Sequence, residues 1–97
     1  IKNVLQKTGL KVSDIDVWEI NEAFSVVTQV AMKELSIPAE NVNIHGGAVA
    51  MGHPIGASGA RLLTTALHAL KTHNKKHALV TLCIGGGEAT AIALELA

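Results

Sequence analysis

The order of hydrophobic and polar residues divides the chain into alternating helical and extended segments. Phe24, Val27, Ala31 and Leu35 recur at steps of three and four residues, which predicts an amphipathic helix over Glu22–Leu35. Short apolar runs bounded by turn residues predict strands. The expected elements are a helix that ends at Thr8 before Gly9, a strand over Val17–Ile20, the helix over Glu22–Leu35, a strand over Val42–Ile44, a helix over Ala57–Thr72, and strands over Ala78–Ile84 and Thr90–Leu96.

The last two expected strands are apolar on both faces, which is typical of strands in the middle of layered α/β structures. The three glycines at 85–87 between them allow a tight reversal, so the pattern predicts an antiparallel hairpin. The buried stripe of the helix before them is expected at Gly59, Leu63, Ala66, Leu67 and Leu70. The fold class that follows is α/β, with a mixed sheet flanked by helices.

The composition indicates surface that other protein covers. Hydrophobic residues make up 48% of the 97 residues and charged residues 16%, and the mean hydropathy is +0.35. A small domain has much surface and should be more polar. We therefore expect residues 1–97 to be one domain that further chain or partner subunits cover. The first residue, Ile1, is consistent with a fragment or a processed segment.

The charge pattern argues against some classes of function. Net charge is zero and the pI is about 7.1, so no global basic field points to nucleic acid. The basic run over residues 71–77 is expected to be a solvated loop. Residues 78–97 carry Glu88, Glu95 and three glycines, which argues against a membrane span. The single cysteine excludes an internal disulfide and fits a reducing compartment, so we expect a cytoplasmic protein.

His53 is the first candidate for chemistry, because it stands between Gly52 and Pro54 in a glycine-rich loop, His45–Gly56, just before a predicted helix. These glycines match neither a phosphate-binding loop nor the dinucleotide fingerprint. They are better suited to bring backbone and imidazole close to a substrate. By itself, His53 is equally well explained as a turn residue.

Asn21 and Cys83 also follow or end predicted strands. Asn21 is interpreted first as the N-cap of the next helix, although it could also hold a water. Cys83 is interpreted first as a small buried hydrophobe, although three glycines follow closely and exposed N–H groups beside a thiol suit an oxyanion. The other four histidines are expected to be ordinary polar residues, and no cluster has zinc-site spacing. All three candidates follow or end predicted strands, and sites in open α/β sheets gather where strands end, so we consider the three residues together.

Three ordered motifs then resemble the C-terminal domain of the thiolase family, in particular its acetyl-CoA acetyltransferases. They are NEAF at residues 21–24, GHPIGASGARLL at residues 52–63 and CIGGGEATAIALE at residues 83–95. The resemblance extends over nearly the whole chain. It implies a layered α-β-α-β-α fold of two similar domains, of which this C-terminal domain contributes a layered α-β-α part. It also implies a homo-oligomer that is commonly a tetramer, and a place in fatty acid metabolism. The implied chemistry is reversible Claisen condensation of acetyl-CoA, or thiolysis of a 3-ketoacyl-CoA, with coenzyme A thioesters as substrates and no cofactor or metal.

The resemblance also implies roles for individual residues. His53 corresponds to the histidine that activates a nucleophilic cysteine and helps bind the thioester oxygen, and Asn21 to the asparagine that holds a water in the same oxyanion hole. Cys83 corresponds to the acid/base cysteine that takes the α-proton of acetyl-CoA. The N–H of Gly85 corresponds to a donor of a second oxyanion hole, and Phe24 to a residue near the acyl end of the pocket.

The chain departs from the family pattern in having one cysteine, so the nucleophile of the first domain is missing. We therefore expect activity in a parent protein and none in these 97 residues alone. Decarboxylating ketoacyl synthases and the sterol-carrier type of thiolase share the fold and a similar histidine loop. The LCIGGG segment argues against both, since an acid/base cysteine is needed only where an unactivated α-proton is removed. A structural or interaction fragment that completes another chain is the non-enzyme alternative.

Overall fold

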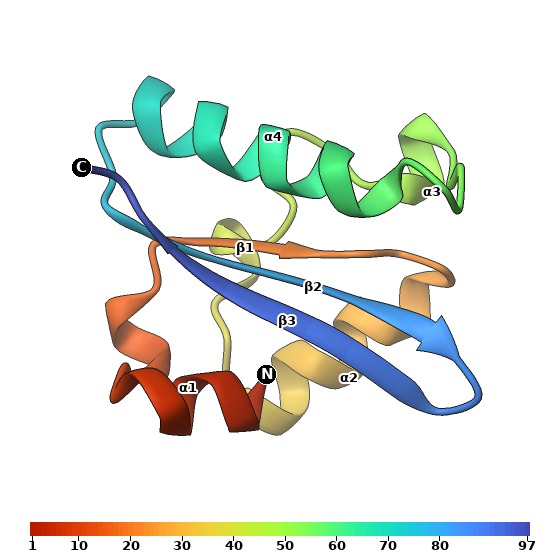
Figure 1. The fold of residues 1–97 in the computed structure, drawn as a ribbon, viewed down its shortest axis with the longest axis horizontal. Coiled ribbons are helices and arrows are strands. Elements are labelled where there is room, and N and C mark those ends of the chain that lie inside the picture. The colour runs from red at the N-terminus through yellow and green to blue at the C-terminus, as the bar shows by residue number, and fades with distance from the viewer.

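The computed structural model describes all 97 residues and has three layers, with a three-stranded sheet between two layers of helices (Figure 1). The helix α4 covers one face of the sheet, and α1 and α2 cover the other. This arrangement confirms the predicted α/β class with a mixed sheet flanked by helices. The elements are α1 (Lys2–Thr8), η1 (Val12–Asp14), β1 (Val17–Ile20), α2 (Ser25–Leu35), η2 (Ala39–Asn41), α3 (Ala48–Met51), α4 (Ser58–Thr72), β2 (His77–Gly85) and β3 (Glu88–Glu95).

The sheet has β2 at its centre, with β1 parallel on one side and β3 antiparallel on the other. The register pairs Ile20 with Thr81 and Leu79 with Ala93. The predicted hairpin is confirmed. The expectation that its second strand lies inside the sheet is wrong, because β3 is an edge strand in which no residue is buried. No strand of this chain pairs with the outer edge of β3. An apolar run therefore does not by itself show whether a strand lies at the centre or at the edge of a sheet.

Side chains alternate across β1 and divide the core in two. Val17 faces α4, where it belongs to a cluster of seven buried residues that includes Leu62 and Leu70. Trp18 faces the opposite side and is buried in a second cluster of five residues, against which residues of α1 and α2 pack. The strand is therefore covered on both faces, as its continuous burial shows.

The buried face of α4 lies one residue away from the expected stripe. Its buried residues are Ser58, Leu62, Ala66, Ala69 and Leu70. Ala66 and Leu70 were expected there, but Leu67 is 40% exposed. A helix turns about 100° per residue, so a stripe centred on residues 58, 62 and 66 leaves position 67 at its margin.

Two predicted boundaries are corrected by the backbone. The helix expected from Glu22 begins only at Ser25, because Phe24 is extended and occupies the N-cap position. The strand expected over Val42–Ile44 is reduced to one bridge between Val42 and Trp18. Asn43 has a left-handed φ of 48°, which takes the chain out of the extended conformation. The loop expected to follow contains the short helix α3.

The side chain of Asn43 hydrogen bonds to the backbone of Ile20 in place of a neighbouring strand. Its Oδ1 accepts the N–H of Ile20 at 2.9 Å, and its Nδ2 donates to the carbonyl of Ile20 at 2.9 Å. A single amide thus satisfies both polar groups of the last β1 residue at the open edge of the strand. The end of β1, where Asn21 follows, is fixed in this way.

Candidate active site

The candidate site lies at the edge of the sheet where β1 and β2 carry their C-terminal ends. The two strands are parallel, and Ile20 pairs with Thr81. Asn21 follows Ile20 and its N–H donates to the carbonyl of Thr81 at 3.0 Å, while Cys83 comes two residues later on β2. Parallel pairing therefore brings the C-terminal ends of both strands, which are far apart in sequence, to one edge.

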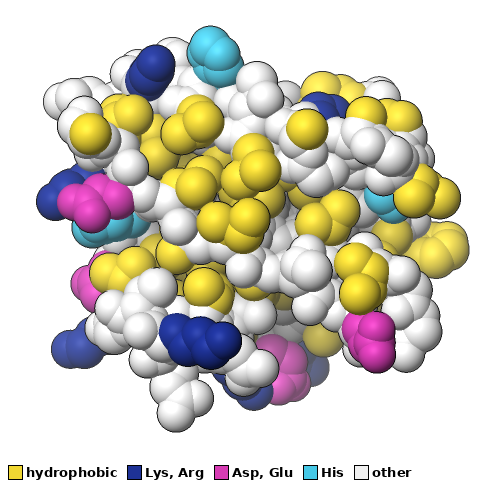
Figure 2. Space-filling model, in the orientation of Figure 1, with side chains coloured by type: hydrophobic (Ala, Val, Ile, Leu, Met, Phe, Trp, Pro, Cys, Tyr) yellow, Lys and Arg dark blue, Asp and Glu magenta, His cyan; other side chains and the backbone are white.

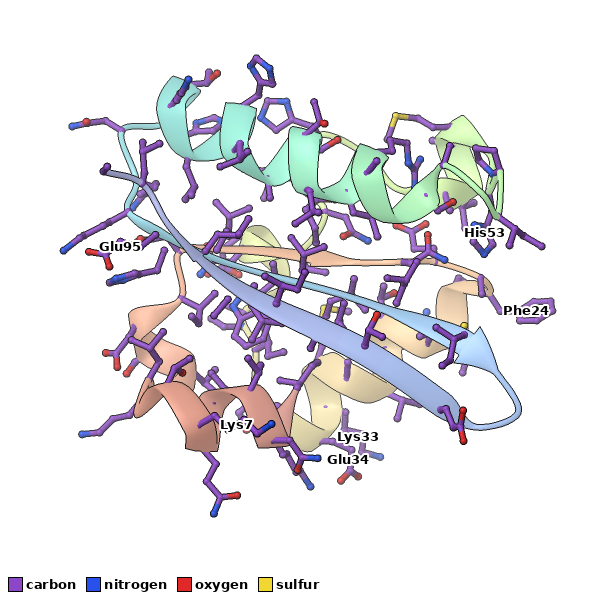
Figure 3. The ribbon with its side chains drawn as sticks, viewed as in Figure 1. Lys7, Phe24, Lys33, Glu34, His53 and Glu95 are labelled. Atoms are coloured by element: carbon purple, nitrogen blue, oxygen red, sulfur yellow. The ribbon has the colours of Figure 1, made fainter.

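His53 reaches the same region from the loop between α3 and α4 (Figure 3). Its Nε2 lies 3.3 Å from Nδ2 of Asn21, across 32 positions of sequence. Gly52 has a φ of 85°, a conformation that side chains disfavour, and Pro54 fixes the backbone on the other side. The loop thus holds the imidazole against Asn21, and the structure brings these two predicted residues together.

Asn21 is not an N-cap, so this first interpretation is wrong. The helix α2 begins four residues later, and Phe24 is the residue in its cap position. Asn21 is instead 2% exposed, and its Oδ1 is buried without a hydrogen-bond partner in the chain. The Nδ2 of Asn21 contacts His53, while its Oδ1 remains free to accept a hydrogen bond. Asn21 is therefore suited to bind a polar group at the site.

Cys83 lines a groove of about 520 Å³ together with Asn21, between the sheet and helices α1 and α2. Its thiol is free and exposed, so the interpretation as a buried hydrophobe is wrong. His53 does not line this groove and makes no hydrogen bond to Cys83. Phe24 does not line it either, since its ring is 75% exposed and points away from the protein (Figure 3).

Gly85 is the last residue of β2, directly before the turn of the hairpin. Gly85, Gly86 and Gly87 all have positive φ, between 67° and 88°, and the strand register shifts between Cys83 and Gly85. Glycine is needed here for its backbone conformation, since a Cβ would meet no other atom at any of the three positions. The backbone next to the thiol consequently lies free of side chains.

A carboxylate that sequence reasoning missed fixes the loop that leads to His53. Oε1 of Glu22 accepts Nδ2 of Asn43 at 2.8 Å, and its Oε2 accepts the N–H of Val49 in α3 at 3.2 Å. Gly47 lies so close to this carboxylate that a Cβ would overlap it. The signal in the sequence was the glycine pair at 46–47, which permits close approach of backbone and side chain.

Glu19 and Arg61 form a second missed feature, beneath α4. Glu19 is 1% exposed and shares the face of β1 on which Val17 lies. Burial raises the pKa of the Glu19 carboxyl to about 7; the guanidinium of Arg61 opposes this rise, and Glu22 adds to it. Arg61 donates from Nη1 to the carbonyl of Gly52 at 3.3 Å, so it also holds the residue before His53.

The remaining histidines are not grouped as a metal site. His45 and His73 are hydrogen bonded through their Nε2 atoms at 3.0 Å. No group of three or more His, Cys, Asp or Glu side chains is close enough to hold a metal ion. None of the helices combines the length and the apolar character that crossing a bilayer requires.

Comparison with known proteins gives consistent matches along the chain. A family model described as the thiolase C-terminal domain matches residues 1–96. The acetyl-CoA acetyltransferase of Escherichia coli (strain K12) is 50% identical over 97% of this chain and 24% of its own length. The cytosolic and mitochondrial acetyl-CoA acetyltransferases of Rattus norvegicus are 47% and 50% identical over 98% of the chain, which covers 24% and 22% of their lengths. The chain thus spans about a quarter of the curated relatives it matches.

Proposed function

Since this chain belongs to the thiolase family, as its C-terminal domain, we propose that it serves in an acyltransferase that condenses two acetyl-CoA molecules. The products are acetoacetyl-CoA and free coenzyme A, and thiolysis of a 3-ketoacyl-CoA is the reverse reaction. The observation that carries the proposal is the contact between Asn21 and His53 at 3.3 Å. It places an imidazole and an amide with a free acceptor together at the ends of parallel strands, where substrates of α/β proteins bind.

The role proposed for His53 is to move a proton and then to hold an oxygen. The imidazole accepts the proton of a nucleophilic thiol supplied by another part of the protein, and that thiol attacks the carbonyl of acetyl-CoA. While it carries that proton, His53 donates a hydrogen bond to the oxygen of the thioester under attack, as does a water on Asn21, because negative charge grows on this oxygen. The leaving coenzyme A then takes up the proton.

The role proposed for Cys83 is acid/base chemistry at carbon. Its thiolate removes the α-proton of a second acetyl-CoA, whose carbanion attacks the acyl thioester. This attack displaces the enzyme sulfur as a thiolate, which takes up the proton from Cys83. The support is positional, since the thiol is exposed and the backbone at Gly85 and the next two glycines carries no side chain. An acyl group can therefore lie against the sulfur, and the N–H of Gly85 is the donor proposed for its oxygen. Phe24 is proposed to border the acyl end of the pocket.

The test separates loading of the acyl group from carbon–carbon bond formation. In the polypeptide that carries this domain together with a nucleophilic thiol, Cys83→Ala is incubated with labelled acetyl-CoA. Label should still reach the protein, whereas formation of acetoacetyl-CoA should fall by several orders of magnitude. Thr64→Ala, at an exposed position of α4, is the matched control and should retain both steps. A folded Cys83→Ala protein that no longer becomes acylated would overturn the assignment.

The exposed apolar side chains support the proposed partners. Large hydrophobic residues remain exposed on α2 and its N-cap, on α3 and the loop after it, on α4 and on the hairpin: Phe24, Val26, Val30, Val49, Met51, Ile55, Leu67, Ile84 and Ile92. Figure 2 shows hydrophobic side chains across the face between α4 and β3 and at the right-hand end. Such surface is usually covered. We propose that residues 1–97 are one domain of a larger protein, covered by another domain and by sister subunits of a homotetramer.

The remaining parts of the proposal concern cofactors, cellular location and metabolic role. Coenzyme A thioesters serve as substrates, and the reaction is proposed to need no cofactor or metal, because imidazole, amide and thiol groups supply its proton transfers and oxyanion contacts. A cytoplasmic location and a role in fatty acid metabolism are proposed. Cytosolic and mitochondrial names both occur among the relatives. Because a catalytic thiol must stay reduced, both compartments are compatible with this chemistry.

A further inference from the structure

The imidazole of His53 is held on both of its nitrogens, and one of the two partners has no role in the proposal above. Nδ1 lies 2.6 Å from Oγ of Ser58, the first residue of α4. Ser58 is fully buried, and its Oγ also lies 3.0 Å from the carbonyl oxygen of Pro54. The hydroxyl therefore sits between the histidine ring and the backbone of the loop that carries the ring.

Counting hydrogens fixes the direction of both bonds. A serine hydroxyl has one hydrogen, and a carbonyl oxygen can only accept. The bond to Pro54 uses that hydrogen, so the bond to His53 must run the other way, from Nδ1–H to a lone pair of Oγ. In the neutral ring this leaves Nε2 without a hydrogen.

The contact on the other nitrogen leads independently to the same tautomer. The amide nitrogen Nδ2 of Asn21 can only donate, and it lies 3.3 Å from Nε2 of His53. Nε2 must then be the acceptor. The contacts with Asn21, which follows β1, and with Ser58, in α4, thus both place the hydrogen of the neutral imidazole on Nδ1.

Capping of α4 does not explain the serine. The N-cap position is Ala57, without any side-chain cap, and the hydroxyl of Ser58 is turned back toward the loop four residues earlier. A serine in the first turn of a helix commonly bonds to nearby backbone. The additional bond to an imidazole nitrogen, in a fully buried position, goes beyond that local role.

We propose that Ser58 is a positioning residue that holds His53 in the Nδ1–H tautomer and thereby keeps Nε2 available as a proton acceptor. The catalytic role of this tautomer rests on the function proposed above, whereas the tautomer is inferred from the hydrogen bonds alone. A neutral hydroxyl fixes the ring without placing a second charge beside it. When Nε2 takes a proton, the hydrogen on Nδ1 stays where it is, so proton transfer needs no rearrangement on the Ser58 side.

The first measurement is spectroscopic and needs no catalysis. Long-range ¹H–¹⁵N correlation spectra of the ¹⁵N-labelled chain are recorded at a pH at which the imidazoles are neutral, with His53→Gln for assignment. The nitrogen shifts should show His53 as Nδ1–H in the unchanged chain and in Ser58→Thr, which retains a hydroxyl. The Ser58 contact, at 2.6 Å, is much shorter than the Asn21 contact, at 3.3 Å. Ser58→Ala should therefore shift the ring toward the Nε2–H tautomer even though Asn21 remains, and Thr64→Ala should leave it unchanged. Far-UV circular dichroism confirms folding.

Two results would overturn the proposal. One is an unchanged chain in which His53 carries its hydrogen on Nε2, a result that does not depend on any variant folding. The other is a folded Ser58→Ala chain that keeps the Nδ1–H pattern. The second measurement is made in the polypeptide with the complete site, where kcat of Ser58→Ala should fall about 10- to 100-fold with little change in KM. If the tautomer shifts as expected but the unchanged protein transfers no acetyl group, the proposed function fails and the positioning role stands.

Discussion

Replacing Glu19 by glutamine should stabilise the chain at neutral and alkaline pH and leave it unchanged in acid. Burial raises the pKa of Glu19 from its ordinary value of 4.5 to about 7. Below pH 4.5 the carboxyl is protonated in both the folded and the unfolded chain. Between pH 4.5 and about pH 7 only the unfolded chain loses the proton, so the free energy of unfolding falls as the pH rises. Above pH 7 both states are ionised and the free energy of unfolding falls no further.

The size of this effect follows from the two proton affinities. Each tenfold difference in affinity between folded and unfolded chain corresponds to about 1.4 kcal/mol, so the ionised carboxylate costs about 3 kcal/mol above pH 7. The cost is not reduced by solvent, because Glu19 is 1% exposed. Glu19→Gln keeps the shape and removes the charge, and should recover most of that amount at pH 8.

The assay is urea denaturation between pH 4 and pH 8, followed by the fluorescence of Trp18. This is the single tryptophan of the chain, it is fully buried, and it stands next to Glu19 in β1. Glu40→Gln, which removes an exposed carboxylate without a hydrogen bond, is the matched control and should run parallel to the unchanged chain. If the curves of Glu19→Gln and the unchanged chain stay parallel over the whole range, the reasoning is refuted.

Two further predictions concern the loop that carries His53 and its partner. Gly47→Ala should lower the free energy of unfolding by about 1–3 kcal/mol, since the added Cβ overlaps the Glu22 carboxylate; Gly56→Ala, where a Cβ meets nothing, is the control in the same denaturation assay, and equal stabilities would contradict the packing argument. In the polypeptide with the complete site, Asn21→Ala should lower kcat by about 10²- to 10³-fold in a steady-state assay. A loss of activity that merely follows a loss of folded protein would show that Asn21 is structural.

The hydrophobic pattern predicts the order and type of the main elements, because burial against a neighbouring layer is itself a local periodic signal. Val17–Ile20 and the glycine turn of the hairpin were identified in this way. The pattern fails where a single backbone angle decides. Asn43 ends its strand through a left-handed φ, and Phe24 delays its helix by being extended. Neither backbone conformation can be predicted from the pattern of hydrophobic residues.

The candidate site was predicted in part for a similar reason. Asn21 follows a predicted strand and His53 stands between Gly52 and Pro54, so the sequence marks both residues. Ser58, Glu19 and Arg61 act through contacts between β1, α4 and the loop before α4. Ser58 looks like an ordinary first-turn residue until its distance to the imidazole is known. Long-range partners of this kind require the tertiary structure.

The parallel pairing of β1 with β2 also has a consequence for the folding pathway. The hairpin and its contact with α4 join segments that are near one another in sequence, whereas Asp16 and His77, where the parallel pairing begins, are 61 positions apart. Closing a long loop costs entropy before its contacts form, so local contacts come first. We expect His53 and Ser58 to be arranged early with α4, and Asn21 to arrive later with β1. The contact between Asn21 and His53 would then join an early and a later part of the fold, so the site is expected to be complete only after β1 has paired with β2.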